Sequence, residues 1–366
     1  MKKSLKIAFL GTRGIPNNYG GFEQCAEFLS QGLAKKDHDI TVYCSLNHTQ
    51  KTNTWNGVKL VYCNDPEHRL GTIGQFIYDL NCILHARKQR YDVIVQFGYT
   101  SSSIWHWLWP KKAKHLVNMD GLEFLRSKYS SATKYFLRFA EKWATKGADM
   151  LIADNEGIED YLKTKYPSNI VKCITYGAAL PEKHLNNSDV LNRFGLASNK
   201  YDLVICRMEP ENSVETILKA HSQNETERKL VIVGNTSNKF GQQMVDTFQS
   251  DVVLFTQGIY NATDLNVLRS NCQFYIHGHT VGGTNPSLLE AMTSCKKIIA
   301  HDNGFNRSVL GEDGTYFKTE KELDEIFSKN AKDIEDRLVQ TNSKIKLQYQ
   351  WEQIVDAYES AMYELV

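Results

Sequence analysis

The segment from residue 277 to residue 292, HGHTVGGTNPSLLEAM, contains the groups with the clearest chemical potential. It follows a short apolar run, and Pro286 stands where a helix favours proline, at its first position. Backbone N–H groups in a loop of small residues can bind an anion, and Glu290, one turn into the expected helix, can accept hydrogen bonds from ribose hydroxyls. The pattern predicts a site for a phosphorylated ribose; the alternative is a solvated glutamate behind an ordinary turn. The loop residues of the predicted site are Gly282, Gly283, Thr284 and Asn285.

His277 and His279 open the same segment and raise the question of a metal ion. A zinc-type site needs three or four ligands, and no carboxylate or cysteine accompanies the two histidines at ligand spacing. We therefore predict no metal site, and we group both histidines with the residues of the predicted site.

Two further segments follow predicted strands and present groups that bind anions. Gly20 and Gly21 precede the helix predicted for residues 22–35, whose first turn offers free N–H groups and a partial positive charge. Arg207 follows the first strand of the second half, where a guanidinium can bind a diphosphate through paired hydrogen bonds. For each segment the alternative is an ordinary strand-to-helix loop. The glycines do not form the G-x-G-x-x-G pattern, which argues against a nicotinamide or flavin enzyme.

Asp120 follows another predicted strand of the first half, in the segment VNMDGLE at residues 117–123. The carboxyl ends of parallel strands meet at one edge of a sheet, so we expect this carboxylate at the same edge as the first glycine loop. The alternative is a turn-capping role, for which Asp-Gly is common.

Short β-branched runs alternate with amphipathic stretches along the whole chain, which predicts parallel sheets covered by helices on both faces. Two such series fit the length of 366 residues and predict an α/β protein with two doubly wound domains, residues 1–178 and 179–346. Residues 348–365 have the spacing of a single amphipathic helix, so residues 347–366 are expected to pack back on the first domain. The predicted strands are residues 6–10, 39–43, 92–96, 115–118, 150–153, 203–206, 230–233, 252–255, 274–277 and 298–301.

The net charge of +1 conceals an asymmetry between the two halves of the chain. Residues 1–180 carry a net charge of +8 and residues 181–366 a net charge of −7. Much of the positive charge lies in residues 124–146, where basic side chains alternate with Tyr, Phe and Trp on a predicted helix. Such a helix is typical of a membrane-surface contact; the alternative is a domain helix with a solvated basic face. Nucleic acid is disfavoured, since no binding motif accompanies the charge. The basic residues assigned to this surface are Arg126, Lys134, Arg138 and Lys142.

The eight cysteines are scattered without a C-x-x-C pair, which favours reduced thiols and a cytoplasmic protein. The apolar run at residues 7–10 is too short for a signal peptide, and the longest chargeless window, residues 93–110, is too polar for a membrane span.

Two long motifs, GTRGIPNNYGGFE at residues 11–23 and HGHTVGGTNPSLLEAM, resemble the retaining nucleotide-sugar glycosyltransferases of family 4. They are most similar to a bacterial rhamnosyltransferase-like subgroup, and the resemblance extends over nearly the whole chain. It implies the GT-B fold, with two Rossmann-like domains facing across a cleft, and metal-independent transfer with retention of configuration. Surface polysaccharide synthesis at the inner face of the cytoplasmic membrane is the implied setting.

The resemblance also implies roles for individual residues. The second domain would bind the donor, dTDP-L-rhamnose or a UDP-hexose, with Arg207 and the loop amides at the diphosphate and Glu290 at the ribose. The first domain would bind a lipid-linked saccharide, with Asp120 positioning the acceptor hydroxyl. The acceptor or membrane side would further include Arg13, Tyr19 and Glu23.

Two positions depart from the pattern of the wider family. Gly282 stands where that family has the first glutamate of its Glu-x7-Glu pair, and Asn212 stands where it has a lysine. One interpretation is that His277, His279 and Arg13 supply the missing polarity. The other is a catalytically silent protein that binds a nucleotide sugar or a synthase partner.

Overall fold

The computed structural model describes residues 3–18, 20–119, 121–181, 188–224, 226–259, 261–329 and 333–366. The chain divides into two units. The first unit consists of Met1–Leu125, Tyr129–Gly177 and Trp351–Val366, and the second of Arg126–Lys128 and Ala178–Gln350. The main polypeptide therefore passes from the first unit to the second after Gly177 and returns at Trp351.

The first unit is built on an eight-stranded sheet with the order β3-β4-β2-β1-β5-β6-β7-β8. All neighbouring strands are parallel except β3, which is antiparallel to β4. The strands are β1 (Lys6–Leu10), β2 (Asp39–Ser45), β3 (Thr54–Trp55), β4 (Val58–Cys63), β5 (Val93–Phe97), β6 (Lys114–Asn118), β7 (Met150–Ala153) and β8 (Ile170–Cys173).

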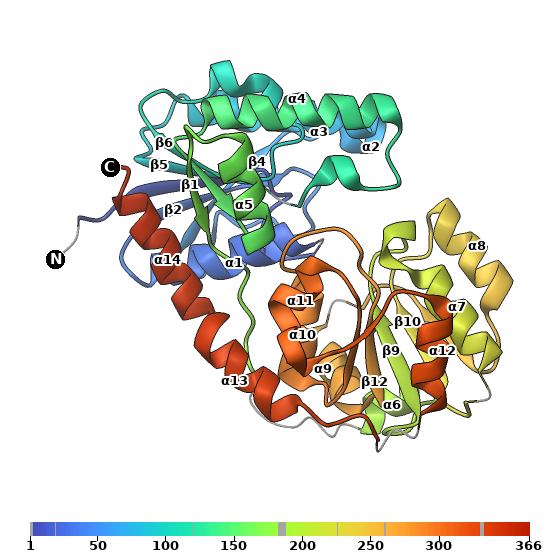
Figure 1. Cartoon of the computed structure of the whole chain (residues 1–366). Helices are drawn as coiled ribbons and strands as arrows, with labels where there is room; N and C mark the ends of the chain where they lie inside the picture. The colour runs from blue at the N-terminus through green and yellow to red at the C-terminus, as the bar shows by residue number, and fades with distance from the viewer. Residues whose placement is uncertain are drawn as a thin grey trace. The chain divides into compact units, whose positions relative to one another are not determined.

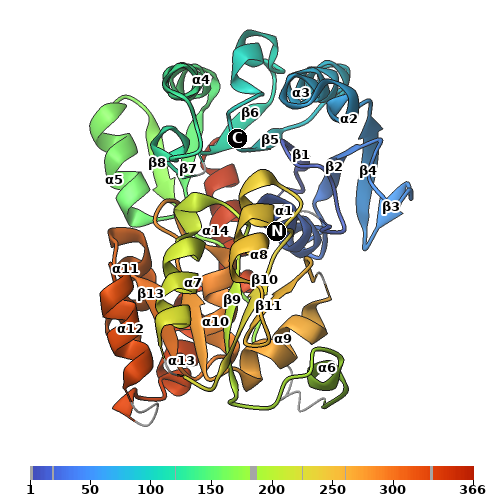
Figure 2. The same ribbon diagram turned by 90° about the vertical axis from the view of Figure 1, so that its right-hand side faces the viewer.

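Helices cover both faces of this sheet, as Figures 1 and 2 show. Helices α3 and α4 lie over one face and α1 lies under the other, next to α14. The ring of Phe28 in α1 stacks on Trp351 of α14 with 4.6 Å between centroids. The helical segments are α1 (Gly21–Ala34), α2 (Glu67–Leu70), α3 (Thr72–Ala86), η1 (Ser103–Leu108), η2 (Glu123–Leu125), α4 (Ser131–Gly147), α5 (Glu156–Lys165) and α14 (Trp351–Tyr363).

The second unit has a fully parallel six-stranded sheet with the order β11-β10-β9-β12-β13-β14. Its core is formed by buried aliphatic and aromatic side chains of the strands, Val204, Ile232 and Phe274 among them. The strands are β9 (Tyr201–Ile205), β10 (Lys229–Val233), β11 (Val253–Thr256), β12 (Phe274–His277), β13 (Ile298–His301) and β14 (Thr315–Phe317).

Helices flank this sheet on both faces, with α7, α8 and α12 on one side and α9 and α10 on the other (Figure 1). The helical segments are α6 (Ser188–Arg193), η3 (Pro210–Asn212), α7 (Val214–Gln223), α8 (Lys239–Phe248), α9 (Ala262–Asn271), α10 (Pro286–Ser294), α11 (Gly304–Leu310), η4 (Gly311–Asp313), α12 (Glu320–Ser328) and α13 (Leu338–Gln348).

The predicted fold class is confirmed, since both units are parallel α/β layers and every predicted strand is present within two residues of its expected bounds. Two predicted helices differ from the structure. The helix expected over residues 348–365 is broken at Tyr349, whose carbonyl oxygen accepts a hydrogen bond of 2.7 Å from the Ala178 N–H. The helix expected from residue 124 begins only at Ser131, because the Ser130 side chain caps it by accepting a hydrogen bond from the Thr133 N–H.

Within the described ranges, none of the helices combines the length and the apolar composition that crossing a bilayer requires.

Candidate functional site

The loop after β9 and the loop after β12 come together at the carboxyl edge of the second sheet. Strands β9 and β12 are parallel neighbours, so both loops leave the sheet on the same side. The carbonyl oxygen of Glu211 accepts hydrogen bonds from both the N–H and the hydroxyl of Thr280, each 2.9 Å long. At Gly278 an added Cβ would lie 2.2 Å from the carbonyl oxygen of Asn212. The loop that contains Arg207 and the start of the segment at residues 277–292, which the sequence analysis treated separately, therefore form one connected structure.

His277 and His279 form a stacked pair within this structure, with 4.3 Å between ring centroids and 11° between the planes. Among the described residues, neither ring nitrogen of His277 nor the Nδ1 of His279 has a hydrogen-bond partner. Burial lowers the pKa of His277 to about 3. Burial, followed by the nearby His277, Arg207 and Arg126, lowers the pKa of His279 well below its ordinary value. Both imidazoles are therefore neutral at pH 7, and each offers one N–H donor and one acceptor nitrogen.

Arg207 lies in the loop after β9 with an exposed side chain. Within the described part of the chain, its guanidinium makes no hydrogen bond or ion pair, so its donors face solvent or a ligand. The neighbouring Asn212 has a different role, because it is buried and its amide donates a 2.7 Å hydrogen bond to the Arg207 carbonyl oxygen. Asn212 thus holds the backbone of the loop that presents Arg207.

The loop at residues 282–285 leads directly into α10. Gly282 has a φ of +138°, a conformation that favours glycine, and an added Cβ there would meet nothing within 4 Å. Asn285 caps the helix, since its side-chain oxygen accepts a 2.9 Å hydrogen bond from the Ser287 N–H. Thr284 is buried, while Gly282 and Gly283 are half-buried. The carboxamide oxygen of Asn285 therefore bonds to the helix, and there is open space beside Gly282.

Glu290 of α10 forms an ion pair with Arg269 of α9. The Glu290 side chain is 29% exposed, whereas that of Arg269 is only 3% exposed. Nothing in the sequence around residue 269 distinguishes this arginine, and it is absent from the predicted site. Glu290, the carboxylate that the sequence analysis assigns to ribose hydroxyls, is therefore held in place by its ion pair with the buried Arg269.

In the first unit, Gly20 is the N-cap of α1, with extended backbone and no side-chain cap. Glu23 is buried, and its carboxylate accepts a 2.9 Å hydrogen bond from the Arg13 N–H. Burial raises the pKa of Glu23. The Arg13 guanidinium makes an ion pair with Glu67 at 2.7 Å. Glu23 is thus a buried carboxylate and Arg13 is not an isolated charge. The assignment of both residues to the acceptor or membrane side stays a prediction. Asp120 and Tyr19 lie outside the described residues.

The basic segment at residues 124–146 is divided between two environments. Arg126 belongs to the second unit, is 8% exposed, and donates a 3.5 Å hydrogen bond to the carboxylate of Glu211. Its assignment to the membrane surface is wrong, because the guanidinium is buried next to an anion. On α4, Arg138 and Lys142 are exposed and Lys134 is half-buried.

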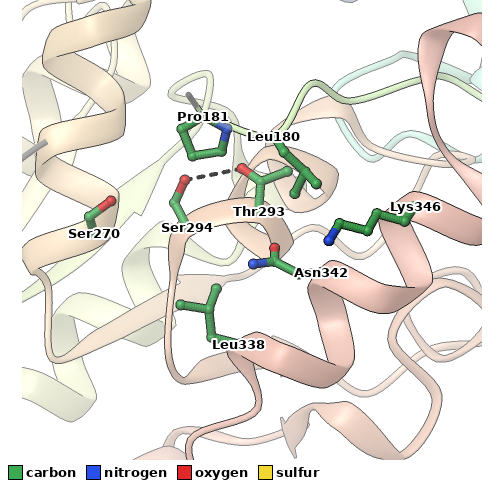
Figure 3. Close-up of a pocket in the computed structure, with 8 residues that line it drawn as sticks. All are labelled: Leu180, Pro181, Ser270, Thr293, Ser294, Leu338, Asn342 and Lys346. Atoms are coloured by element: carbon green, nitrogen blue, oxygen red, sulfur yellow. Dashed lines mark hydrogen bonds between the residues drawn. The ribbon is translucent and has the colours of Figure 1, made fainter. Parts of the chain in front are cut away.

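A cavity of about 190 Å³ lies elsewhere in the second unit (Figure 3). It adjoins the C-terminal end of α10, whereas the loop of residues 282–285 lies at the N-terminal end, so the cavity is not part of the candidate site. Its walls are formed by Leu180, Pro181, Ser270, Thr293, Ser294, Leu338, Asn342 and Lys346.

Across the described ranges, no three His, Cys, Asp or Glu side chains are grouped so that they could hold a metal ion. Metal independence stays a prediction.

The chain matches two family profiles. Residues 4–179 match the domain of unknown function DUF1972, and residues 193–347 match the glycosyl transferases of group 1. A comparison with curated protein sequences gave no match. The second match covers the loops after β9 and β12 and the whole of α10.

Solved structures with the same fold include several glycosyltransferases. Sucrose-phosphate synthase from Thermosynechococcus elongatus superposes with a TM-score of 0.81 at 14% identity, with 99% of each chain covered. HepE from Anabaena, in complex with UDP and glucose, gives 0.76 at 17% identity over 98% of this chain and 100% of that one. The trehalose 6-phosphate synthase of Burkholderia multivorans gives 0.73 at 9% identity, covering 99% of each chain. The chain therefore has the two-domain GT-B fold, and residues 193–347 of its second unit match the glycosyl transferases of group 1.

Proposed function

We propose that this glycosyltransferase is a retaining enzyme of family 4, which transfers a sugar from a nucleotide diphosphate to a lipid-linked saccharide. The observation that carries the proposal is the convergence of Arg207, the His277–His279 pair and the loop before Glu290 at one edge of the second sheet. The complex of HepE with UDP and glucose supports a nucleotide sugar as the donor. dTDP-L-rhamnose is the proposed donor, with a UDP-hexose as the alternative.

The proposed site stabilises the charge that develops on the departing diphosphate. Arg207 supplies an exposed cation, and the glycine loop at the start of α10 supplies N–H groups and the positive end of a helix. The neutral His277 and His279 add N–H donors whose nitrogens have no partner among the described residues. Donors fixed before the reaction stabilise such charge without reorganisation. No metal ion is required in this scheme.

The first unit is proposed to bind the acceptor. Asp120 would position the acceptor hydroxyl, and the amides at Gly20 and Gly21 would contribute to diphosphate binding. The departing phosphate itself would take the proton from the acceptor on the same face of the sugar, which gives retention.

Helix α4 supports a location at the inner face of the cytoplasmic membrane, with the protein bound peripherally. Tyr135 and Phe139 are 65% and 38% exposed, and their rings contact each other with 4.8 Å between centroids. Arg138 and Lys142 are exposed on the same helix. Exposed aromatic rings beside basic side chains suit an anionic lipid surface.

The proposed donor site is tested by measuring hydrolysis and transfer of dTDP-L-rhamnose and UDP-glucose with the Arg207→Ala and Glu290→Gln variants. We expect Arg207→Ala to lower kcat/KM by about 100-fold, because the variant lacks one donor to the charge that develops on the diphosphate. Arg193→Ala, which removes an exposed arginine of α6, is the matched control and should be unchanged. Wild-type rates in both site variants would contradict the assignment.

A catalytically silent protein is the second candidate, favoured by the structural role of Asn212. At the position where the wider family has a lysine, this amide is buried and bonded to a backbone carbonyl oxygen, so it supplies no cation. Nucleoside diphosphates that raise the melting temperature, without turnover of any sugar nucleotide, would support this alternative.

A further inference from the structure

The guanidinium of Arg269 is buried, and its carboxylate partner is Glu290. Nη2 donates to Oε2 of Glu290, and Nη1 donates a 3.3 Å hydrogen bond to the side-chain oxygen of Asn266. Among the described residues, Nε of Arg269 has no partner. The carboxylate of Glu290 thus provides the compensating negative charge for this cation.

This arrangement restricts where Glu290 can lie. A buried cation without its counter-ion is strongly unfavourable. Movement of the Glu290 carboxylate into solvent would leave Arg269 unpaired and would therefore cost free energy. A free glutamate side chain would lose rotamer freedom on binding a sugar hydroxyl, whereas one already held does not. The ion pair therefore places a preorganised acceptor at the surface of α10.

We propose that Arg269 is a positioning residue for the nucleoside of the donor, and that it sets how strongly the site selects for the hydroxyls of the donor's pentose, which are the 3′-hydroxyl in dTDP and the 2′- and 3′-hydroxyls in UDP. The inference rests on the proposed function, in which Glu290 accepts hydrogen bonds from those hydroxyls. Arg269 acts only through Glu290, because it is buried beneath the carboxylate. Its removal is expected to affect hydroxyl recognition rather than diphosphate binding, which Arg207 and the glycine loop provide.

The experiment compares two ligands that differ only in the hydroxyls. Calorimetry gives the Kd of the nucleoside diphosphate that wild-type protein binds best among UDP, dTDP, GDP and ADP, and the Kd of its 2′,3′-dideoxy analogue. A hydrogen bond to a charged acceptor corresponds to a preference of about 10-fold or more for the hydroxylated ligand. We expect Arg269→Met to reduce this preference at least fivefold while changing the Kd of the dideoxy analogue less than threefold. Adding Glu290→Gln to Arg269→Met should then cause little further loss.

Two further variants separate positioning from general destabilisation. Arg269→Lys retains a cation and should give an intermediate preference, and it decides the question if Arg269→Met does not fold. Arg228→Met breaks another buried ion pair of the second unit, Arg228–Asp202, and should lower stability without changing the preference. An unchanged preference in the folded Arg269 variants would overturn the inference. Failure of the wild-type protein to bind any of the four nucleotides would instead refute the proposed function.

Discussion

At the scale of single residues, the candidate site combines neutral imidazoles with an exposed cation, Arg207, and a buried cation, Arg269. His277 is kept uncharged by burial, while Arg207 is exposed in the adjoining loop. A buried charge needs a partner, but a neutral ring needs only a hydrogen bond, so the protein can keep these nitrogens ready for a ligand at a moderate cost. Arg269 is a buried charge and does have such a partner, because the carboxylate of Glu290 compensates it.

The depressed pKa of His277 predicts acid sensitivity. The unfolded chain takes up a proton near pH 6.5, whereas the folded protein does so only near pH 3, so stability falls as the pH drops below about 6.5. This histidine alone should cost about 2 kcal/mol of unfolding free energy between pH 7 and pH 5. Denaturant titrations at both pH values should show a smaller loss in His277→Asn than in wild-type protein. An equal loss in both would contradict the assignment of a neutral, buried His277.

Glu290 gives a second prediction at this scale. Glu290→Ala leaves the buried Arg269 without a counter-ion and should lower stability by about 3–5 kcal/mol. Glu290→Gln keeps an acceptor oxygen for the guanidinium and should cost clearly less. Thermal unfolding of the two variants side by side measures the difference, and equal melting temperatures would mean that the ion pair contributes nothing.

At the scale of elements, the site depends on contact between two loops rather than on any one helix. The segment after β9 and the segment after β12 are joined through the carbonyl oxygen of Glu211 and the close approach at Gly278. Neighbouring parallel strands bring the loops to one edge, and the absence of a side chain at Gly278 lets the backbones touch.

Gly278→Ala should therefore separate the loops. The new Cβ would lie 2.2 Å from the Asn212 carbonyl oxygen, and relief of such a clash costs about 1–3 kcal/mol. We expect lower stability together with weaker nucleoside diphosphate binding, measured by thermal unfolding and calorimetry. Gly304→Ala, where an added Cβ meets nothing within 4 Å, is the matched control and should change neither.

Periodicity predicted the strands and α10 well, because apolar spacing and a cap at Asn285 act locally. Periodicity did not predict helix boundaries and side-chain environments that depend on contacts between residues far apart in the sequence. The apolar spacing continues through Tyr349, so nothing local revealed the break that Ala178 stabilises. Arg126 fits a basic helix face in sequence, yet it lies before the Ser130 cap and against Glu211. No sequence pattern around Arg269 distinguishes it, since its importance comes only from its ion pair with Glu290.

At the scale of the whole molecule, charge is distributed unevenly between the two halves of the chain, +8 over residues 1–180 and −7 over residues 181–366. Part of the positive charge is used internally, as the ion pair of Arg13 with Glu67 shows. The exposed Arg138 and Lys142 beside Tyr135 and Phe139 support the proposed membrane attachment.

The double variant Arg138→Glu/Lys142→Glu should bind anionic vesicles at least about tenfold more weakly, because each basic residue near such a surface contributes roughly 1 kcal/mol. Flotation with phosphatidylglycerol vesicles at increasing salt measures the effect. The control Lys239→Glu/Lys321→Glu changes the net charge equally on the second unit and should float like wild-type protein. Equal loss in both double variants would show that net charge alone, and not α4, governs binding.

The return of the chain to the first unit at Trp351 has a consequence for biosynthesis. During translation, the Phe28 face of α1 emerges early, but its partner α14 is made only after the ribosome has completed the second unit. At roughly 5–20 residues per second, synthesis of the chain from Gly177 to Trp351 takes about 10–35 seconds. The nascent first unit therefore keeps this apolar helix face uncovered until α14 has been made.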